Sequence, residues 1–218
     1  MKKLSLLFLF ITATCFGFAQ TDKYTQAMLP KVAALDSTST AEKYTELANS
    51  FERIAIAEKT QWLPYYYAAL SNILSGYMTL DASGGGDVAK LDPLADKAET
   101  LLNKADELSK NNSEIYVVKK MIANLRLVAD PTNRYMQYGP IAQQALETAR
   151  KLNPENPRTY LLEGQDKLYT PEQFGGSKTE AKKMFETAMQ KYESFKPESA
   201  ISPNWGRPMT QYFISQVQ

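Results

Sequence analysis

The segment over residues 142–164, AQQALETARKLNPENPRTYLLEG, constrains the fold more than any other part of the chain. Helical spacing places Ala142, Leu146 and Ala149 on one face of a helix. Two of these three side chains are small, so a second helix can approach closely there. Pro154 then ends the helix, and Asn156 and Pro157 are residues that cap and begin a new one. The segment therefore predicts two helices joined by a tight turn.

Pairs of alanines seven residues apart recur along the chain, a spacing that places both members of a pair on one helix face. The pairs are Ala48/Ala55, Ala98/Ala105, Ala142/Ala149 and Ala181/Ala188. Long amphipathic runs dominate the chain and are separated by turns rich in Gly, Pro, Asn and Asp. No part of the sequence has the alternating pattern of a series of strands. Ordinary alanine-rich amphipathic helices are the alternative explanation of the pairs. The sequence predicts an all-α fold of antiparallel helix pairs whose alanines face the neighbouring layer.

The combined pattern resembles the tetratricopeptide repeat (TPR). The first-helix pattern of that family is matched by Tyr67, Leu70, Ser71 and Leu74. A second copy, at Tyr160, Glu163 and Gly164, departs from it at Glu163, where an apolar residue is usual. In a third copy, beginning at Tyr116, the usual Leu-Gly pair is replaced by Lys119 and Lys120. The resemblance covers about residues 41–195 and implies an α-α solenoid that binds a partner rather than catalysing a reaction.

Three further segments look like signatures of exported TPR-like proteins from Bacteroidetes-type bacteria. They are WLPYYYAA at 62–69, TPEQFGG at 170–176 and PNWG at 203–206. This narrower resemblance extends the general one to about residue 206 and implies no enzymatic activity.

The repeat period is longer than the 34 residues of the TPR family. From Ala48 to Ala98 is 50 residues, from Ala98 to Ala142 is 44, and from Ala142 to Ala181 is 39. We assign the excess to turns between first and second helices, at Leu80–Leu91, Asp130–Gly139 and Tyr169–Gly176. Such elongated intra-repeat loops would cluster along one rim of a solenoid. They are either a functional rim or neutral length drift, which costs little free energy.

The first nineteen residues are typical of a bacterial signal peptide. Lys2 and Lys3 precede an apolar run, and small residues surround a cleavage site at Ala19. A membrane anchor is the rival interpretation, although the run is shorter than the ~20 apolar residues needed to span a bilayer. Lipidation of Cys15 is a third. We expect export to the periplasm or the medium, no membrane span after cleavage, and a single helical domain over 20–218 with three to four helix pairs and a C-terminal cap.

Composition limits the chemistry of the exported chain. The sequence has no histidine, and its one cysteine, Cys15, lies in the signal segment. Serine and cysteine triads and zinc sites therefore cannot be built. Removal of Lys2 and Lys3 from 25 basic side chains leaves 23 against 24 acidic ones, a balance that argues against nucleic acid as a partner. We expect no catalytic residues, no cofactor and no metal.

Other sites of reaction or ion binding receive little support from the sequence. The run GGGDVAK at 84–90 lacks both the Gly-Lys-Ser/Thr ending and the preceding strand of a phosphate loop. Asp81 and Asp87 could hold calcium weakly, but no EF-hand spacing surrounds them. Acidic residues are plentiful, so a pair of hydrolase carboxylates stays open as the third function class.

The TPR resemblance places a concave binding wall on the first helices of the pairs. The residues expected to bind a partner there are Tyr65, Asn72, Asn124, Arg158 and Gln165. Our main functional prediction is a non-enzymatic scaffold or adaptor of the cell envelope that holds a protein or peptide segment on this face. The alternative is an envelope accessory that binds a small molecule or glycan through its many tyrosines.

Overall fold

The computed structural model describes residues 23–81 and 84–218, and the regular secondary structure within these ranges is entirely helical. The predicted all-α fold is therefore confirmed. The predicted signal peptide lies outside the described residues. Within the described ranges, every helix is too short or too polar to cross a membrane.

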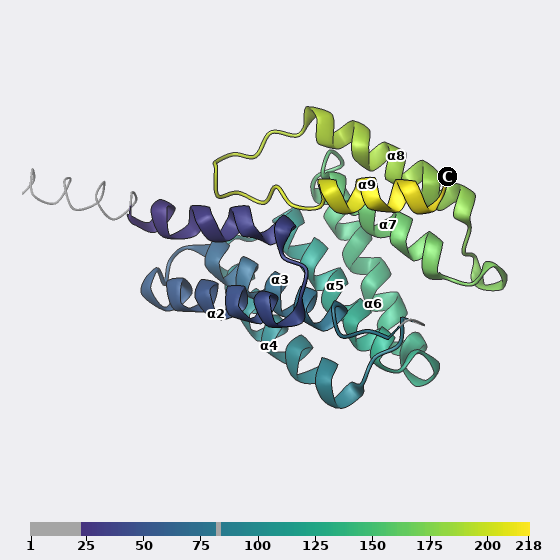
Figure 1. Ribbon diagram of the computed structural model, residues 1–218, viewed down its shortest axis with the longest axis horizontal. Coiled ribbons are helices and arrows are strands. Elements are labelled where there is room, and N and C mark those ends of the chain that lie inside the picture. Colours follow the sequence, from purple (N-terminus) through teal and green to yellow (C-terminus); the bar gives the residue numbers. More distant parts are fainter. Residues whose placement is uncertain (1–22, 82–83) are drawn as a thin grey trace, which may run out of the picture.

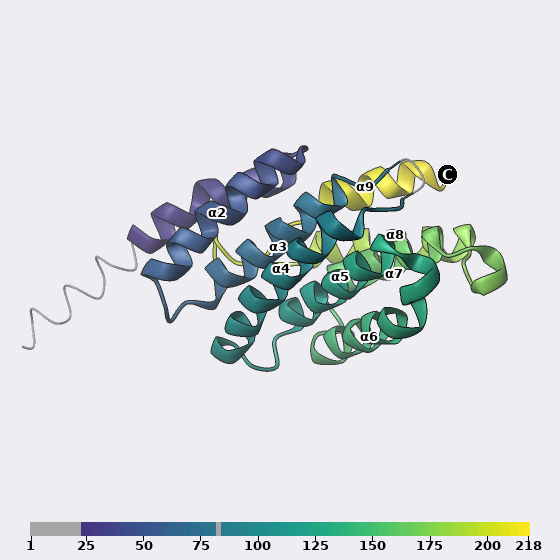
Figure 2. The ribbon, with the colours of Figure 1, turned by 90° about the horizontal axis from the view of Figure 1, so that it is seen from below.

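A helix over residues 23–34 and the short η1 (Leu35–Ser37) precede a series of antiparallel helices. The series consists of α2 (Ala41–Ala57), α3 (Trp62–Tyr77), α4 (Val88–Leu108), α5 (Ser113–Ala129), α6 (Pro131–Leu152), α7 (Pro157–Tyr169), the short η2 (Glu172–Phe174), α8 (Lys178–Ser194) and α9 (Arg207–Gln216). Figures 1 and 2 show the helices stacked side by side in chain order, with α9 lying along the last pair. The arrangement is solenoid-like, as predicted.

Helix starts follow the capping signals of the sequence. Asn156 caps α7 by accepting a hydrogen bond from the Arg158 amide at 3.1 Å, and Pro157 is the first helical residue. Ser177 caps α8 in the same way, accepting from the Glu180 amide at 3.2 Å. Polar side chains that satisfy free amides thus fix the starts of α7 and α8, whereas α3 and α9 begin without a side-chain cap.

The prediction of a long loop over Asp130–Gly139 is wrong. Asp130 caps α6, which begins at Pro131 and continues through Pro140. An Asp-Pro pair can follow the end of one helix or begin another. Here it does both, because α5 ends at the residue before Asp130 and α6 begins at Pro131. Consequently the nine residues 131–139 of the predicted loop are helical and add about two and a half turns to α6.

The alanine pairs are buried, as predicted. All eight members are at most 5% exposed, and seven of the eight are completely buried, Ala142 being the exception. Gly164 shows how close the layers come, because a Cβ atom added there would lie 2.5 Å from the Phe185 ring of α8. Small residues on one helix therefore let the next helix of the stack pack directly on its backbone.

The C-terminal strap, residues 195–206, runs from α8 back across the stack toward the helix over residues 23–34 (Figure 1). The Tyr67 hydroxyl of α3 donates to the Ile201 carbonyl at 2.9 Å, and the Gly206 amide donates to Asp36 at 3.1 Å. The strap thus ties the last helix pair to the first one.

Candidate functional site

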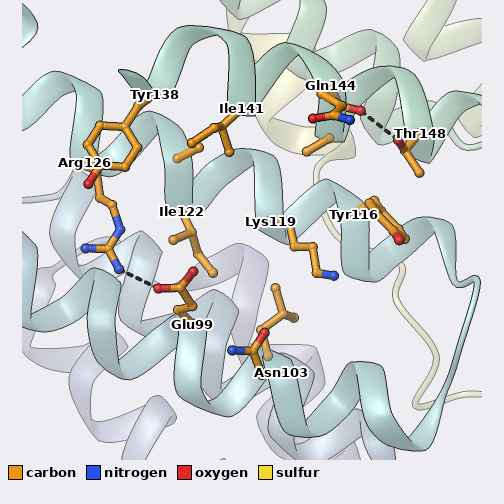
Figure 3. Close-up of a pocket in the computed structure, with 13 residues that line it drawn as sticks. Glu99, Asn103, Tyr116, Lys119, Ile122, Arg126, Tyr138, Ile141, Gln144 and Thr148 are labelled. Carbon is orange, nitrogen blue, oxygen red and sulfur yellow. Dashed lines mark hydrogen bonds and ion pairs between the residues drawn. The ribbon is translucent and has the colours of Figure 1, made fainter. Parts of the chain in front are cut away.

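An open groove of about 510 Å³ lies along α5, with α4 on one side and α6 on the other (Figure 3). It is lined by Glu99, Leu102, Asn103, Tyr116, Lys119, Ile122, Ala123, Arg126, Tyr138, Ile141, Gln144, Ala145 and Thr148. Its volume is within the range of sites that hold small organic ligands, about 300–1,000 Å³.

Two helices present the groove with the same residue spacing. The lining residues of α5 are Tyr116, Lys119, Ile122, Ala123 and Arg126. Those of α6 are Tyr138, Ile141, Gln144, Ala145 and Thr148. Each set begins with a tyrosine and continues at intervals of three, three, one and three, which is one face of an α-helix. Because α5 and α6 are antiparallel, the two tyrosines lie at opposite ends of the groove (Figure 3).

The floor of the groove is apolar and its rim is polar. Leu102, Ile122, Ala123 and Ala145 are each at most 8% exposed, so they form a closely packed base. Ile141 is 48% exposed and extends the apolar surface up the α6 wall. A flat apolar ligand that covered this floor would remove both its own surface and that of Ile141 from water.

Two cationic side chains of α5 lie in the groove, each beside one of its tyrosines. The Lys119 Nζ lies 4.5 Å from the centroid of the Tyr116 ring, and the Arg126 guanidinium carbon lies 6.0 Å from that of Tyr138. The two α5 positions are seven residues apart in the sequence, which separates them by about 10 Å along the helix. Each end of the groove therefore combines an aromatic face with a positive charge.

Carboxylates of α4 pair with both cations. Arg126 contacts Asp96 at 2.7 Å and Glu99 at 2.8 Å, and Lys119 contacts Asp106 at 3.0 Å. These acids are partly exposed, and ion pairs exposed to water contribute only about 0–1 kcal/mol each. Each of these ion pairs therefore contributes little to the stability of the fold.

The Tyr138 end of the groove is held in place by a second ion pair. Arg134, one turn before Tyr138 in α6, bonds both carboxylate oxygens of Asp92 in α4, at 2.7 and 2.8 Å. Arg134 also donates to the Arg126 carbonyl of α5 at 3.2 Å. The hydrogen bonds from Arg134 hold the pKa of the Asp92 carboxyl below its usual value. This fork fixes the first turns of α6 against both other walls of the groove.

The five residues predicted to bind a partner all lie in the described ranges, and none of them lines the groove. Arg158 and Asn72 are buried, at 0% and 3% exposure. Asn72 donates to the Ala68 carbonyl of its own helix at 2.8 Å, so its side chain is used inside α3. Tyr65 is half-buried and packs against the core.

The remaining two residues, Asn124 and Gln165, are half-buried on neighbouring helices. The Asn124 amide donates to Asp166 at 3.3 Å, and Asp166 also pairs with the buried Lys120 at 2.6 Å. Gln165 lies beside Met209 of α9, with its Nε2 at 3.6 Å from the sulfur. The structure therefore places Asn124 in a polar cluster with Lys120 and Asp166, and places Gln165 against α9. The predicted partner-binding role of all five stays a prediction.

Sequence reasoning missed the groove residues, although one signal was available. The sequence pattern singles out Tyr116 and Lys119 only because Lys119 departs from the TPR pattern. The identical spacing of the lining residues on α5 and α6 is present in the sequence. It could be recognised as a shared helix face only if Tyr138 was known to be helical, and the sequence analysis placed Tyr138 in a loop.

The comparisons with known proteins concern the whole chain. No protein-family model matches the sequence, and no curated protein matches it. Among solved structures, the HusA haemophore from Porphyromonas gingivalis is similar, with 34% sequence identity and a TM-score of 0.78. The similarity covers 89% of this chain and 92% of that chain. The chain belongs to the family of this haemophore.

This family relationship agrees with part of the predicted resemblance. Porphyromonas is one of the Bacteroidetes, the bacteria to which the narrower resemblance pointed. Membership of the TPR family itself stays a prediction. The name of the related protein describes a small-molecule carrier, so it favours our alternative function over a protein-interaction scaffold.

Proposed function

We propose that this protein binds haem or a related tetrapyrrole in the groove between α4, α5 and α6, without catalysing a reaction. The observation that carries the proposal is the groove itself, an apolar floor with a tyrosine and a cation at each end. The relationship to a haemophore gives the ligand class. A signal peptide at the N-terminus would place this binding activity in the periplasm or the medium.

The residues of the groove fit the chemistry of a tetrapyrrole. The macrocycle is flat and apolar, which suits a floor built from Leu102, Ile122 and Ala123. Its carboxylate side chains require cations or hydrogen-bond donors, and Lys119 at one end of the groove supplies both. Burial of the ring at about 25 cal/mol per Å² of apolar surface then supplies most of the binding free energy.

The groove offers few ligands for iron. The sequence has no histidine, and its one cysteine lies outside the described residues. Among side chains known to ligate haem iron, the described lining contains two tyrosines, Tyr116 and Tyr138. We therefore expect recognition to depend on the ring and its carboxylates.

The competing scaffold function has less support. It required an exposed row of side chains on the first helices, but Arg158 and Asn72 are buried. Our main prediction from sequence is thus replaced by its alternative, in which a small molecule is the ligand.

Titration of the purified protein with haemin, followed by the Soret band and by quenching of Trp62 and Trp205, tests the proposal. Ile141→Ala should weaken binding about fivefold, because it removes about 1 kcal/mol of apolar contact. Ile56→Ala is the matched control, since Ile56 is 65% exposed on α2, outside the groove. If Ile141→Ala and Ile56→Ala change haemin affinity equally, the ligand binds outside the groove. If the wild-type protein shows no saturable binding of haemin, the proposed function is refuted.

A further inference from the structure

The two ends of the groove differ in charge. At one end, Arg126 is matched by two carboxylates, Asp96 and Glu99, both more than half exposed. At the other, Lys119 and Lys110 share the single carboxylate of Asp106, at 3.0 and 3.8 Å. The Arg126 end therefore has one negative charge in excess, and the Lys119 end has one positive charge in excess.

The acidic wall belongs to one helix face. Asp96 and Glu99 are three residues apart on α4, so both side chains point toward Arg126 from the same side. The neighbouring Arg134 does not offset them, because both of its terminal nitrogens bond the Asp92 carboxylate. A ligand carboxylate placed at this end would be repelled by Asp96 and Glu99, and the cation there, Arg126, is already paired with both of them.

We infer that the groove selects tetrapyrroles whose carboxylates lie on one edge of the ring, and that it holds this edge at Lys119. The inference rests on the proposed function and adds to it an orientation and a limit on ligand charge. A dicarboxylate ring such as protoporphyrin can direct both carboxylates toward Lys119 and Lys110 and leave its uncharged edge beside Arg126. A ring with carboxylates around its whole periphery must place at least one beside Asp96 and Glu99.

The tyrosines suit the same orientation. Tyr138 covers the acidic end, where its ring can contact an uncharged macrocycle edge. Ile141, at the next turn of α6, continues this apolar contact toward the middle of the groove. The Tyr138 end thus accepts hydrocarbon, and the Lys119 end accepts anions.

The test compares three metal-free porphyrins with two, four and eight carboxylates: protoporphyrin, coproporphyrin and uroporphyrin. Fluorescence titration of the wild-type protein should give coproporphyrin up to about fivefold weaker binding than protoporphyrin, since an unfavourable exposed charge contact is worth up to about that factor. Uroporphyrin should bind more weakly still. Higher salt should reduce the difference, because it screens the repulsion.

The double variant Asp96→Asn/Glu99→Gln removes the acidic wall without removing side-chain volume. It should remove most of the difference in affinity between coproporphyrin and protoporphyrin. The double variant Glu186→Gln/Glu193→Gln, on the exposed surface of α8, makes the same change in net charge and should leave the difference in affinity unchanged. Lys119→Gln should instead weaken protoporphyrin binding about threefold, with Arg126 intact.

The outcomes separate this inference from the function on which it depends. If protoporphyrin binds but coproporphyrin binds equally well or better, the charge limit is refuted and tetrapyrrole binding stands. The same conclusion follows if the double variant leaves the gap between the two ligands unchanged. If none of the three porphyrins binds, the proposed function and this inference both fail.

Discussion

Arg158 of α7 and Glu114 of α5 form an ion pair inside the protein, where the Arg158 side chain is completely buried and that of Glu114 is 12% exposed. The Arg158 Nε donates to Glu114 at 2.8 Å, and Nη1 donates to the Trp205 carbonyl of the C-terminal strap at 3.3 Å. Burial alone would lower the pKa of Arg158, but the Glu114 carboxylate outweighs burial and raises it above its ordinary value. Arg158 therefore stays charged, and with Glu114 it joins two helix pairs to the strap.

Arg158→Met should destabilise the protein by about 3–5 kcal/mol, because it leaves the Glu114 carboxylate buried without its cation. Urea unfolding followed by circular dichroism measures the change in the free energy of unfolding. The control is Arg53→Met on the exposed surface of α2, where we expect a change within about 0.5 kcal/mol. A loss below about 1 kcal/mol for Arg158→Met would show that the pair is not needed to hold the strap.

A second prediction concerns Tyr66, which links Glu114 to the strap. Its hydroxyl donates to Glu114 at 3.2 Å and accepts from the Trp205 indole at 2.8 Å, and the ring is completely buried. Tyr66→Phe leaves the indole N–H without its partner and should cost about 1–3 kcal/mol. Tyr212→Phe, at a ring 59% exposed on α9, is the matched control and should be neutral. Equal unfolding midpoints for the two variants would contradict the assignment.

A third prediction concerns the close packing of α7 on α8. Gly164→Ala would place a methyl group 2.5 Å from the Phe185 ring, so it should destabilise the protein by about 1–3 kcal/mol. In a protein that already carries Phe185→Leu, the same glycine substitution should cost less, since a smaller side chain leaves room for the methyl group. A double-mutant cycle measures this coupling. Additive losses would indicate that the glycine is needed for a reason other than contact with Phe185.

Local rules were sufficient to predict a stack of helices but not every helix start, since α4 begins at Val88, within the predicted turn at Leu80–Leu91. Alanine spacing identified the buried faces, and caps such as Asn156 and Ser177 identified helix starts, because both depend on residues within one or two turns. The start of α6 was missed because Asp130-Pro131 both ends one helix and begins another. Local sequence does not say how many residues separate the end of α5 from the start of α6.

The candidate site was beyond local rules because its contacts join distant parts of the chain. Lys119 departs from the TPR pattern, and its partner Asp106 lies thirteen residues earlier on the preceding helix. Glu163, which departs at the corresponding position of its repeat, pairs with Arg150, also thirteen residues earlier. Each departure thus has a compensating charge on the neighbouring helix. Arg158 shows the opposite difficulty, since its charge suggested exposure and only the three-dimensional contacts with Glu114 explain its burial.

The last prediction concerns Arg134 and Asp92, which hold the first turns of α6 over the groove. Arg134→Gln should let the pKa of the Asp92 carboxyl return toward its ordinary value of about 3.9, as measured by carboxyl NMR titration. A lowered carboxyl pKa stabilises the folded state at pH values above the unfolded pKa, and this contribution is lost as the pH falls through the folded pKa. The Arg134 variant should therefore lose less stability than the wild type when the pH is lowered through this range.

The same variant tests whether the ion pair positions Tyr138 for ligand binding. With Arg134 removed, Tyr138 should be less ordered at its end of the groove, and haemin affinity should fall about threefold to tenfold through loss of preorganisation. Arg53→Gln on α2 changes the net charge equally and should leave affinity unchanged. Tyr138→Ala in the Arg134→Gln background should then add little further loss, because the two substitutions act through one contact. Fully additive losses would mean that Arg134 acts on the ligand by its charge rather than by holding Tyr138 in place.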